Sequence, residues 1–77
     1  MKRLTRKQAD IFWFIKNHIR SEGMSPTAKE IGAEFNMFPS GAWAHVEALI
    51  RKEAVSVKRG TSRSLVPVKG YRVKVKA

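Results

Sequence analysis

The sequence contains no cysteine, which excludes a disulfide framework, a thiolate zinc site and a cysteine nucleophile. It also has no apolar run near the roughly 20 residues that a membrane-spanning helix needs. The chain begins with cations, as a signal peptide does, but Lys7, Asp10 and Lys16 interrupt any apolar segment and no small-residue cleavage site follows. We therefore expect a cytoplasmic protein. Its 77 residues leave room for one small domain.

Acidic residues are scarce: 6 Asp and Glu stand against 16 Lys and Arg, a formal charge of +10. The cations gather at the two ends, because residues 1–20 carry six of them with a single acid and residues 54–77 carry seven with none. Such asymmetry favours a polyanionic partner, either nucleic acid or an anionic membrane surface. A basic tail that is merely solvated is the simpler alternative.

Residues suited to catalysis or metal binding are also few. The two histidines, His18 and His45, fall on different predicted helices without a carboxylate cluster beside them. His18 lies near the end of its helix, where a cation suits the helix dipole, and His45 borders an apolar face. The sequence has neither a Gly-x-Ser-x-Gly elbow nor a phosphate-binding loop. We predict no enzymatic activity, no metal site, no cofactor and no small-molecule substrate.

Three helices are predicted from capping boxes and from apolar residues at helical spacing. The boxes Thr5–Gln8 and Thr27–Glu30 begin the first two helices, which we expect to end at Gly23 and Asn36. The first helix covers residues 6–22, and the third begins at Pro39 or Ser40 and reaches about residue 53. Leu4 immediately precedes the first capping box, where it can pack against the first helix as a hydrophobic staple. The residues expected to face the core are Ile11, Phe12, Ile15, Ile19, Ile31, Phe35, Ala42, Val46, Leu49 and Ile50.

After the helices the apolar period changes towards two, which predicts strands. Residues 54–58 and 63–66 are the expected strands of a hairpin, with Gly60 at positive φ in the turn and Pro67 at an edge or an end. Residues 71–76 alternate strictly and form either a third strand or a frayed tail. We divide the chain into a domain over residues 1–68 and a basic tail or additional strand over residues 69–77.

Two short helices joined by a tight turn, followed by a basic hairpin, predict an α+β fold: a three-helix winged helix-turn-helix with a small C-terminal antiparallel β-hairpin as the wing. A helix has the width of the DNA major groove, so we predict that residues 40–52 enter it. The capped short helices and the wing argue against a membrane surface. The predicted base-reading residues are Ser40, Gly41, Trp43, Ala44 and Glu47. The predicted phosphate and wing contacts are Thr27, Lys29, Arg51, Lys52, Lys58, Arg59, Thr61, Ser62 and Arg63.

Several of these residues have a purely structural alternative. Trp43 either meets bases or closes the core against Phe38, and Glu47 either accepts from a cytosine amino group or pairs with Arg51 at i,i+4. We place Ala48 on the same outer face of the third helix. The alternative function is a winged-helix protein-interaction module that acts through exposed aromatics, with Trp13, Phe14, Phe38 and Trp43 as candidates.

Over about residues 1–66 the chain resembles the N-terminal DNA-binding domain of the LexA repressors. The stretch Gly23-Met24-Ser25-Pro26-Thr27, followed by Glu30-Ile31, is the most specific part of the resemblance. It implies a winged helix-turn-helix that binds operator DNA with its third helix, and hence a transcriptional regulator, expected in the cytoplasm at the nucleoid. The other matching residues are Leu4, Thr5, Gln8, Phe12, Ile15, His18, Ile19, His45, Ala48, Leu49, Arg51, Lys52, Gly60, Ser62 and Arg63.

The departures from this family concern specificity and assembly. Residues 37–41 are one residue shorter than the family's turn, and Trp43-Ala44 stands where the family has a Glu-Glu pair that helps set operator preference. The family's self-cleaving and dimerising domain has no counterpart in these 77 residues, so we do not carry self-cleavage over. Tight binding usually needs two half-sites, which suggests a homodimer on palindromic DNA. The basic tail either adds phosphate contacts or pairs with a second copy through its alternating strand.

Overall fold

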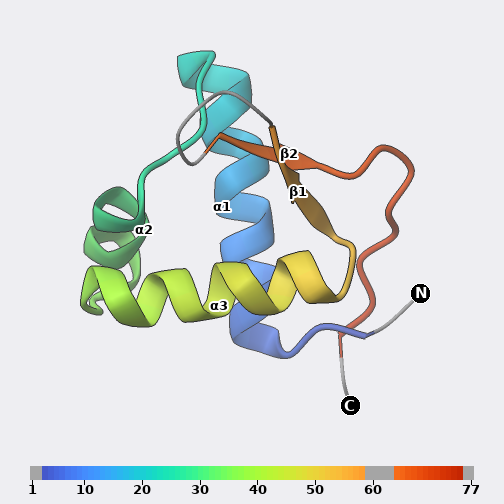
Figure 1. The fold of residues 1–77 in the computed structure, drawn as a ribbon, viewed down its shortest axis with the longest axis horizontal. Helices are drawn as coiled ribbons and strands as arrows, with labels where there is room; N and C mark the ends of the chain where they lie inside the picture. The colour runs from blue at the N-terminus through green and yellow to red at the C-terminus, as the bar shows by residue number, and fades with distance from the viewer. Residues whose placement is uncertain (1–2, 59–63, 76–77) are drawn as a thin grey trace.

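The computed structural model describes residues 3–58 and 64–75. It contains three helices, α1 (Arg6–Glu22), α2 (Ala28–Phe35) and α3 (Pro39–Arg51), followed by two strands, β1 (Val55–Val57) and β2 (Leu65–Pro67) (Figure 1). All three predicted helices are confirmed, each within two residues of its expected ends. The predicted turn of the wing, with Gly60, lies outside the described residues.

Local hydrogen bonds explain where α1 and α2 begin and end. In each capping box the threonine hydroxyl accepts from the backbone amide three residues on, and the Gln8 or Glu30 side chain accepts in return from the threonine amide. Both predicted boxes are therefore confirmed. The helices end at Gly23 and Asn36, which adopt the predicted left-handed conformation with φ of 77° and 55°.

The third helix differs at both ends. Its N-cap is Phe38, whose side chain makes no capping hydrogen bond. At the other end, Glu53 adopts a left-handed conformation with φ of 61°, and its amide donates to the Ile50 carbonyl at 3.0 Å. Because a left-handed residue cannot continue a right-handed helix, α3 ends before the predicted residue 53.

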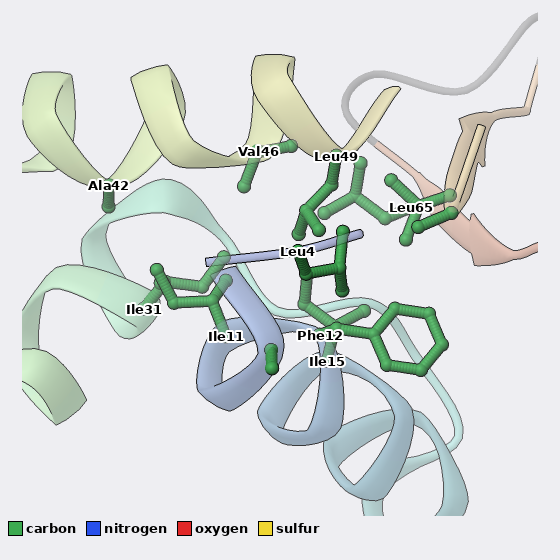
Figure 2. Close-up of a cluster of buried hydrophobic side chains, with 12 residues drawn as sticks. Leu4, Ile11, Phe12, Ile15, Ile31, Ala42, Val46, Leu49 and Leu65 are labelled. Carbon is green, nitrogen blue, oxygen red and sulfur yellow. The ribbon is translucent and has the colours of Figure 1, made fainter. Parts of the chain in front are cut away.

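The core forms where α3 crosses α1. Figure 2 shows Ala42, Val46 and Leu49 directed from α3 towards Ile11 and Ile15 of α1. All five are fully buried, which confirms this part of the expected core. Phe12 and Ile31 are also buried, whereas Ile19, Phe35 and Ile50 are partly buried and pack against the cluster. One expectation was wrong: Ala48 is 7% exposed and belongs to the inner side of α3, because the buried stripe is wider than a single row of residues.

The two strands form an antiparallel sheet at the C-terminal end of α3 (Figure 1). Val55 pairs with Pro67, and Val57 pairs with Leu65. Val55 and Leu65 point into the core, whereas Val66 is 42% exposed on the other face. Pro67 is the last residue of β2, as predicted. Three helices followed by this hairpin confirm the predicted α+β winged helix-turn-helix layout.

The segment after β2 returns to the start of the chain, so that the described ends lie on the same side of the molecule (Figure 1). The Tyr71 ring lies 5.6 Å from the Phe12 ring, and Val73 packs against the core. The amide of Leu4 donates to the Lys74 carbonyl at 2.8 Å, and Leu4 forms a parallel bridge with Val75. Up to Val75 the segment is therefore a docked strap with one bridge, which is neither the regular third strand nor the frayed tail considered above.

The turn between α2 and α3 depends on Gly32. A Cβ at this position would collide with the carbonyl oxygen of Met37, whose amide donates to the Gly32 carbonyl at 2.9 Å. Gly32→Ala is expected to lower the free energy of unfolding by about 1–3 kcal/mol, because backbone must move to admit the methyl group.

The matched control is Gly41→Ala in α3, where a Cβ would meet nothing within 4 Å. This variant is expected to keep or raise stability, by about 0.5 kcal/mol, because alanine favours helix. Urea unfolding of both variants measures the difference. Equal effects of the two substitutions would contradict the steric role of Gly32.

Burial raises the pKa of the Tyr71 phenol above its ordinary value of 10.0. Since the sequence has a single tyrosine, a titration of tyrosinate absorbance reports on this residue alone. The neutral phenol is favoured in the folded protein, so docking of the strap is stable below about pH 10 and weakens as pH rises through the raised pKa. We expect the midpoint to fall to the ordinary value in denaturant; identical midpoints in the two states would show that Tyr71 is not docked.

Candidate nucleic-acid interface

The outward side of α3 carries a row of small and polar residues. Ser40, Ala44, Glu47 and Arg51 follow one another at intervals of four, three and four residues, and all four are exposed. Gly41 is exposed beside them and would leave a Cβ without neighbours. The fold therefore brings four of the five predicted base-reading residues, Ser40, Gly41, Ala44 and Glu47, onto one open surface.

The fifth residue, Trp43, is partly buried and packs against the core. Phe38 does not close that core, because 83% of it is exposed. Within the described residues Glu47 and Arg51 form no ion pair with each other, so the structural alternative for Glu47 is not observed. Glu47 is thus exposed on the outer row, and no described residue forms an ion pair or a side-chain hydrogen bond with its carboxylate.

Four of the nine predicted phosphate-binding residues are exposed, at the start of α2, at the end of α3 and after β1. Thr27 stands at the N-cap of α2, where its hydroxyl accepts from the Glu30 amide and keeps its own hydrogen to donate. Lys29 follows in the first turn of α2, Arg51 ends α3, and Lys58 follows β1. Four others, Arg59, Thr61, Ser62 and Arg63, lie outside the described residues.

Lys52 has a different position from the one expected. Its ammonium donates to the Arg3 carbonyl at 3.1 Å and to Gln8 Oε1 at 2.7 Å. Gln8 Oε1 also accepts from the Thr5 amide, so Lys52 joins the end of α3 to the capping box of α1. The Lys52 side chain, which we predicted to contact a phosphate, instead binds the N-terminal segment. Lys52 and Arg3 are 49 positions apart in the sequence, so no local pattern reveals this contact.

Side chains of α1, α2 and the loop between them hold this part of the fold in place. His18 Nδ1 donates to the Met24 carbonyl at 2.9 Å, and its Nε2 lies 3.7 Å from the Glu30 carboxylate. The hydrogen bond from the Thr27 amide, aided by the charge of His18, holds the pKa of Glu30 below its ordinary value. Ser25 Oγ accepts from the Leu65 amide at 3.1 Å, which ties this loop to β2. The sequence indicated a dipole role for His18 but did not reveal these contacts.

The aromatic residues considered for a protein-binding surface are used differently. Phe14 packs edge-on against Phe35 at 5.7 Å and is therefore part of the fold. Trp13 is 45% exposed, with the Lys16 ammonium 5.3 Å from its ring.

Among the described residues no group of three or more potential ligands could hold a metal ion. None of the described helices is long and apolar enough to cross a membrane.

Three packed helices, the third with an open outer row, and a following hairpin define a winged helix-turn-helix domain. Residues 1–64 match the family described as the LexA DNA binding domain, so the chain belongs to that family. This membership confirms the resemblance found in the sequence.

The relatives of this chain include proteins named LexA repressor. The one from Thermosipho melanesiensis is 40% identical over 80 residues, which cover 91% of this chain and 40% of the relative. The one from Glaesserella parasuis is 47% identical over 68 residues, which cover 84% of this chain and 32% of the relative. The chain therefore spans less than half the length of these curated relatives.

The position of Lys52 generates a test. Lys52→Met keeps the length of the side chain but removes its two hydrogen bonds, and we expect a loss of about 1–2 kcal/mol in the free energy of unfolding. Lys29→Met is the matched control, because Lys29 is exposed on α2, and it is expected to change stability by less than about 0.5 kcal/mol. Denaturant unfolding at neutral pH compares them. A Lys52→Met protein as stable as the control would show that this contact contributes nothing.

Proposed function

We propose that this protein binds double-stranded DNA by placing α3 in the major groove, and that it acts as a transcriptional repressor. The observation that carries the proposal is the exposed row of Ser40, Gly41, Ala44 and Glu47 on α3, opposite its buried side. Small residues at this surface let the helix approach base edges closely, and the helix has the width of the groove. The family membership and the name of the relatives support the same function.

Phosphate contacts supply most of the affinity in this proposal. Thr27 and Lys29 at the start of α2 bind the backbone on one side of the groove. Arg51 and Lys58 bind it at the opposite end of α3, next to the hairpin. The wing residues Arg59, Thr61, Ser62 and Arg63 extend these contacts along the flanking duplex. Lys52 is the weakest member of the predicted set, since its ammonium already has two acceptors within the protein.

The preferred sequence is proposed to differ from that of relatives with two glutamates on the recognition helix. Glutamate accepts hydrogen bonds from cytosine, whereas alanine and tryptophan have no acceptor for a cytosine amino group. Here Trp43 and Ala44 occupy those positions, and Glu47 remains as the one exposed carboxylate of the row. Ser40 can donate to or accept from any base edge.

On a palindromic site, a second copy of the protein would bind the second half-site. Pairing through the tail is constrained, because Leu4 already occupies one edge of the strap and Val73 packs against the core of its own chain. We therefore propose that two copies would meet through the DNA or through the free edge of residues 73–75.

The test is a titration of labelled duplex DNA at several salt concentrations. The logarithm of the affinity is expected to fall with the logarithm of salt concentration, with a slope of about −0.9 for each phosphate neutralised. The double substitution Arg59→Ala/Arg63→Ala is expected to weaken binding to all sequences alike. It is also expected to make the slope shallower by the contribution of roughly two phosphate contacts. Changes at the exposed Ser40 are expected to alter preference among sequences instead.

The charge-matched control is Lys16→Ala/Arg20→Ala on α1, on the side turned away from Ile11 and Ile15, which is expected to leave the slope unchanged. Stoichiometry on a palindromic duplex reports one or two copies. Absence of salt-dependent binding to any duplex would reject the proposed function, and a wing variant that binds like the parent would reject the wing contacts.

A further inference from the structure

Phe38 occupies a position that is unfavourable for it on two grounds. Its exposure of 83% is the highest of any large hydrophobic residue in the part of the chain that the structure describes. It is also the N-cap of α3, where a serine, threonine or aspartate would accept from an orphan amide, and its ring cannot do so. The other two helices have complete capping boxes at Thr5 and Thr27. The fold therefore gains nothing evident from an aromatic residue here.

The hollow beside Phe38 is lined by uncharged residues. The ring borders an open hollow of about 390 Å³ that Gly32, Ala33, Asn36 and Met37 also line. The first turn of α3 contains no acidic residue. The start of α3 is therefore an uncharged end with an exposed phenyl ring, on a protein whose formal charge is +10.

The proposed function supplies the occupant for this end of α3. If α3 enters the major groove, its N-terminal end approaches the base edges most closely. The C5-methyl group of thymine is the apolar group that bases present in this groove, and a phenyl ring packs against it without a hydrogen bond. The strong positive charge of the chain favours a polyanionic duplex over an apolar protein partner for the same surface.

We propose that Phe38 is a base-reading residue, which recognises thymine by packing its ring against the C5-methyl group in the major groove. This inference rests on the proposed function and assigns part of its sequence preference. A ring that cannot donate or accept a hydrogen bond discriminates by the methyl group alone. The preferred half-site is then expected to contain thymine at one or two adjacent positions contacted by the start of α3.

The experiment begins with a duplex selected from random sequences by the parent protein. Each thymine is then replaced in turn by deoxyuridine, which removes only the methyl group. The parent is expected to lose about fourfold in affinity at one or two adjacent positions, the effect of burying one methyl group. Phe38→Ala and Phe38→Ser are expected to bind the thymine and uracil duplexes equally.

Phe38→Ser also guards against a folding artefact, because serine is a favoured N-cap and this variant is expected to unfold at a denaturant concentration no lower than the parent. Trp13→Ala removes another exposed aromatic residue, from α1, and is expected to keep the parental preference for thymine. All three variants preserve charge, so the salt dependence of binding is expected to stay unchanged.

The outcomes separate the inference from the function. If the parent binds the duplex with the expected salt dependence but Phe38→Ser retains the same preference for thymine over uracil, the base-reading role is overturned while the function stands. If the parent binds the duplex equally well with deoxyuridine at every thymine position, the base-reading role is also overturned. A protein partner is then the alternative occupant of the surface around Phe38. A parent that binds no duplex overturns both.

Discussion

The packing of α3 across α1 is the contact on which the remaining structure depends. Ala42, Val46 and Leu49 are fully buried against Ile11 and Ile15, and each large aliphatic residue in such a contact contributes about 1.5–3 kcal/mol. This burial fixes the rotation of α3 about its own axis. The outward row from Ser40 to Arg51 is therefore a consequence of core packing, and the candidate interface stands on a rigid support.

Long-range contacts then close this small molecule around its core. Leu4 is fully buried and pairs with the strap at Lys74 and Val75, while Lys52 joins α3 to the segment before α1. Ser25 joins the helix-turn-helix loop to β2. A chain of this length buries a modest fraction of its surface, so such ties between distant segments matter more than they would in a larger domain. They also hold the hairpin in a defined position relative to α3.

The N-terminal end of α3 lacks the side-chain cap that begins the other two helices. The first two helices have the best available caps, whereas the third has an exposed phenyl ring at the same position. The turn that leads to this ring is possible because Gly32 leaves room for the Met37 carbonyl. Local geometry thus leaves the start of α3 exposed, with an apolar side chain where a capping residue would stand.

Short-range patterns were sufficient for the helices, their caps, the hairpin strands and most of the core, because capping boxes and apolar periods act over three to seven residues. They also placed Ser40, Ala44, Glu47 and Arg51 on the outer side of α3, since that side lies opposite the buried stripe. Ala48 was wrongly placed on the outer side, because the width of the buried stripe depends on packing around α3. The end of α3 was placed at residue 53, because the sequence did not reveal the left-handed conformation of Glu53. The contacts of Lys52, Ser25 and the strap join residues 40 or more positions apart. Those, together with the exposure of Phe38, arise only when the helices assemble, because no local pattern records which distant groups will meet.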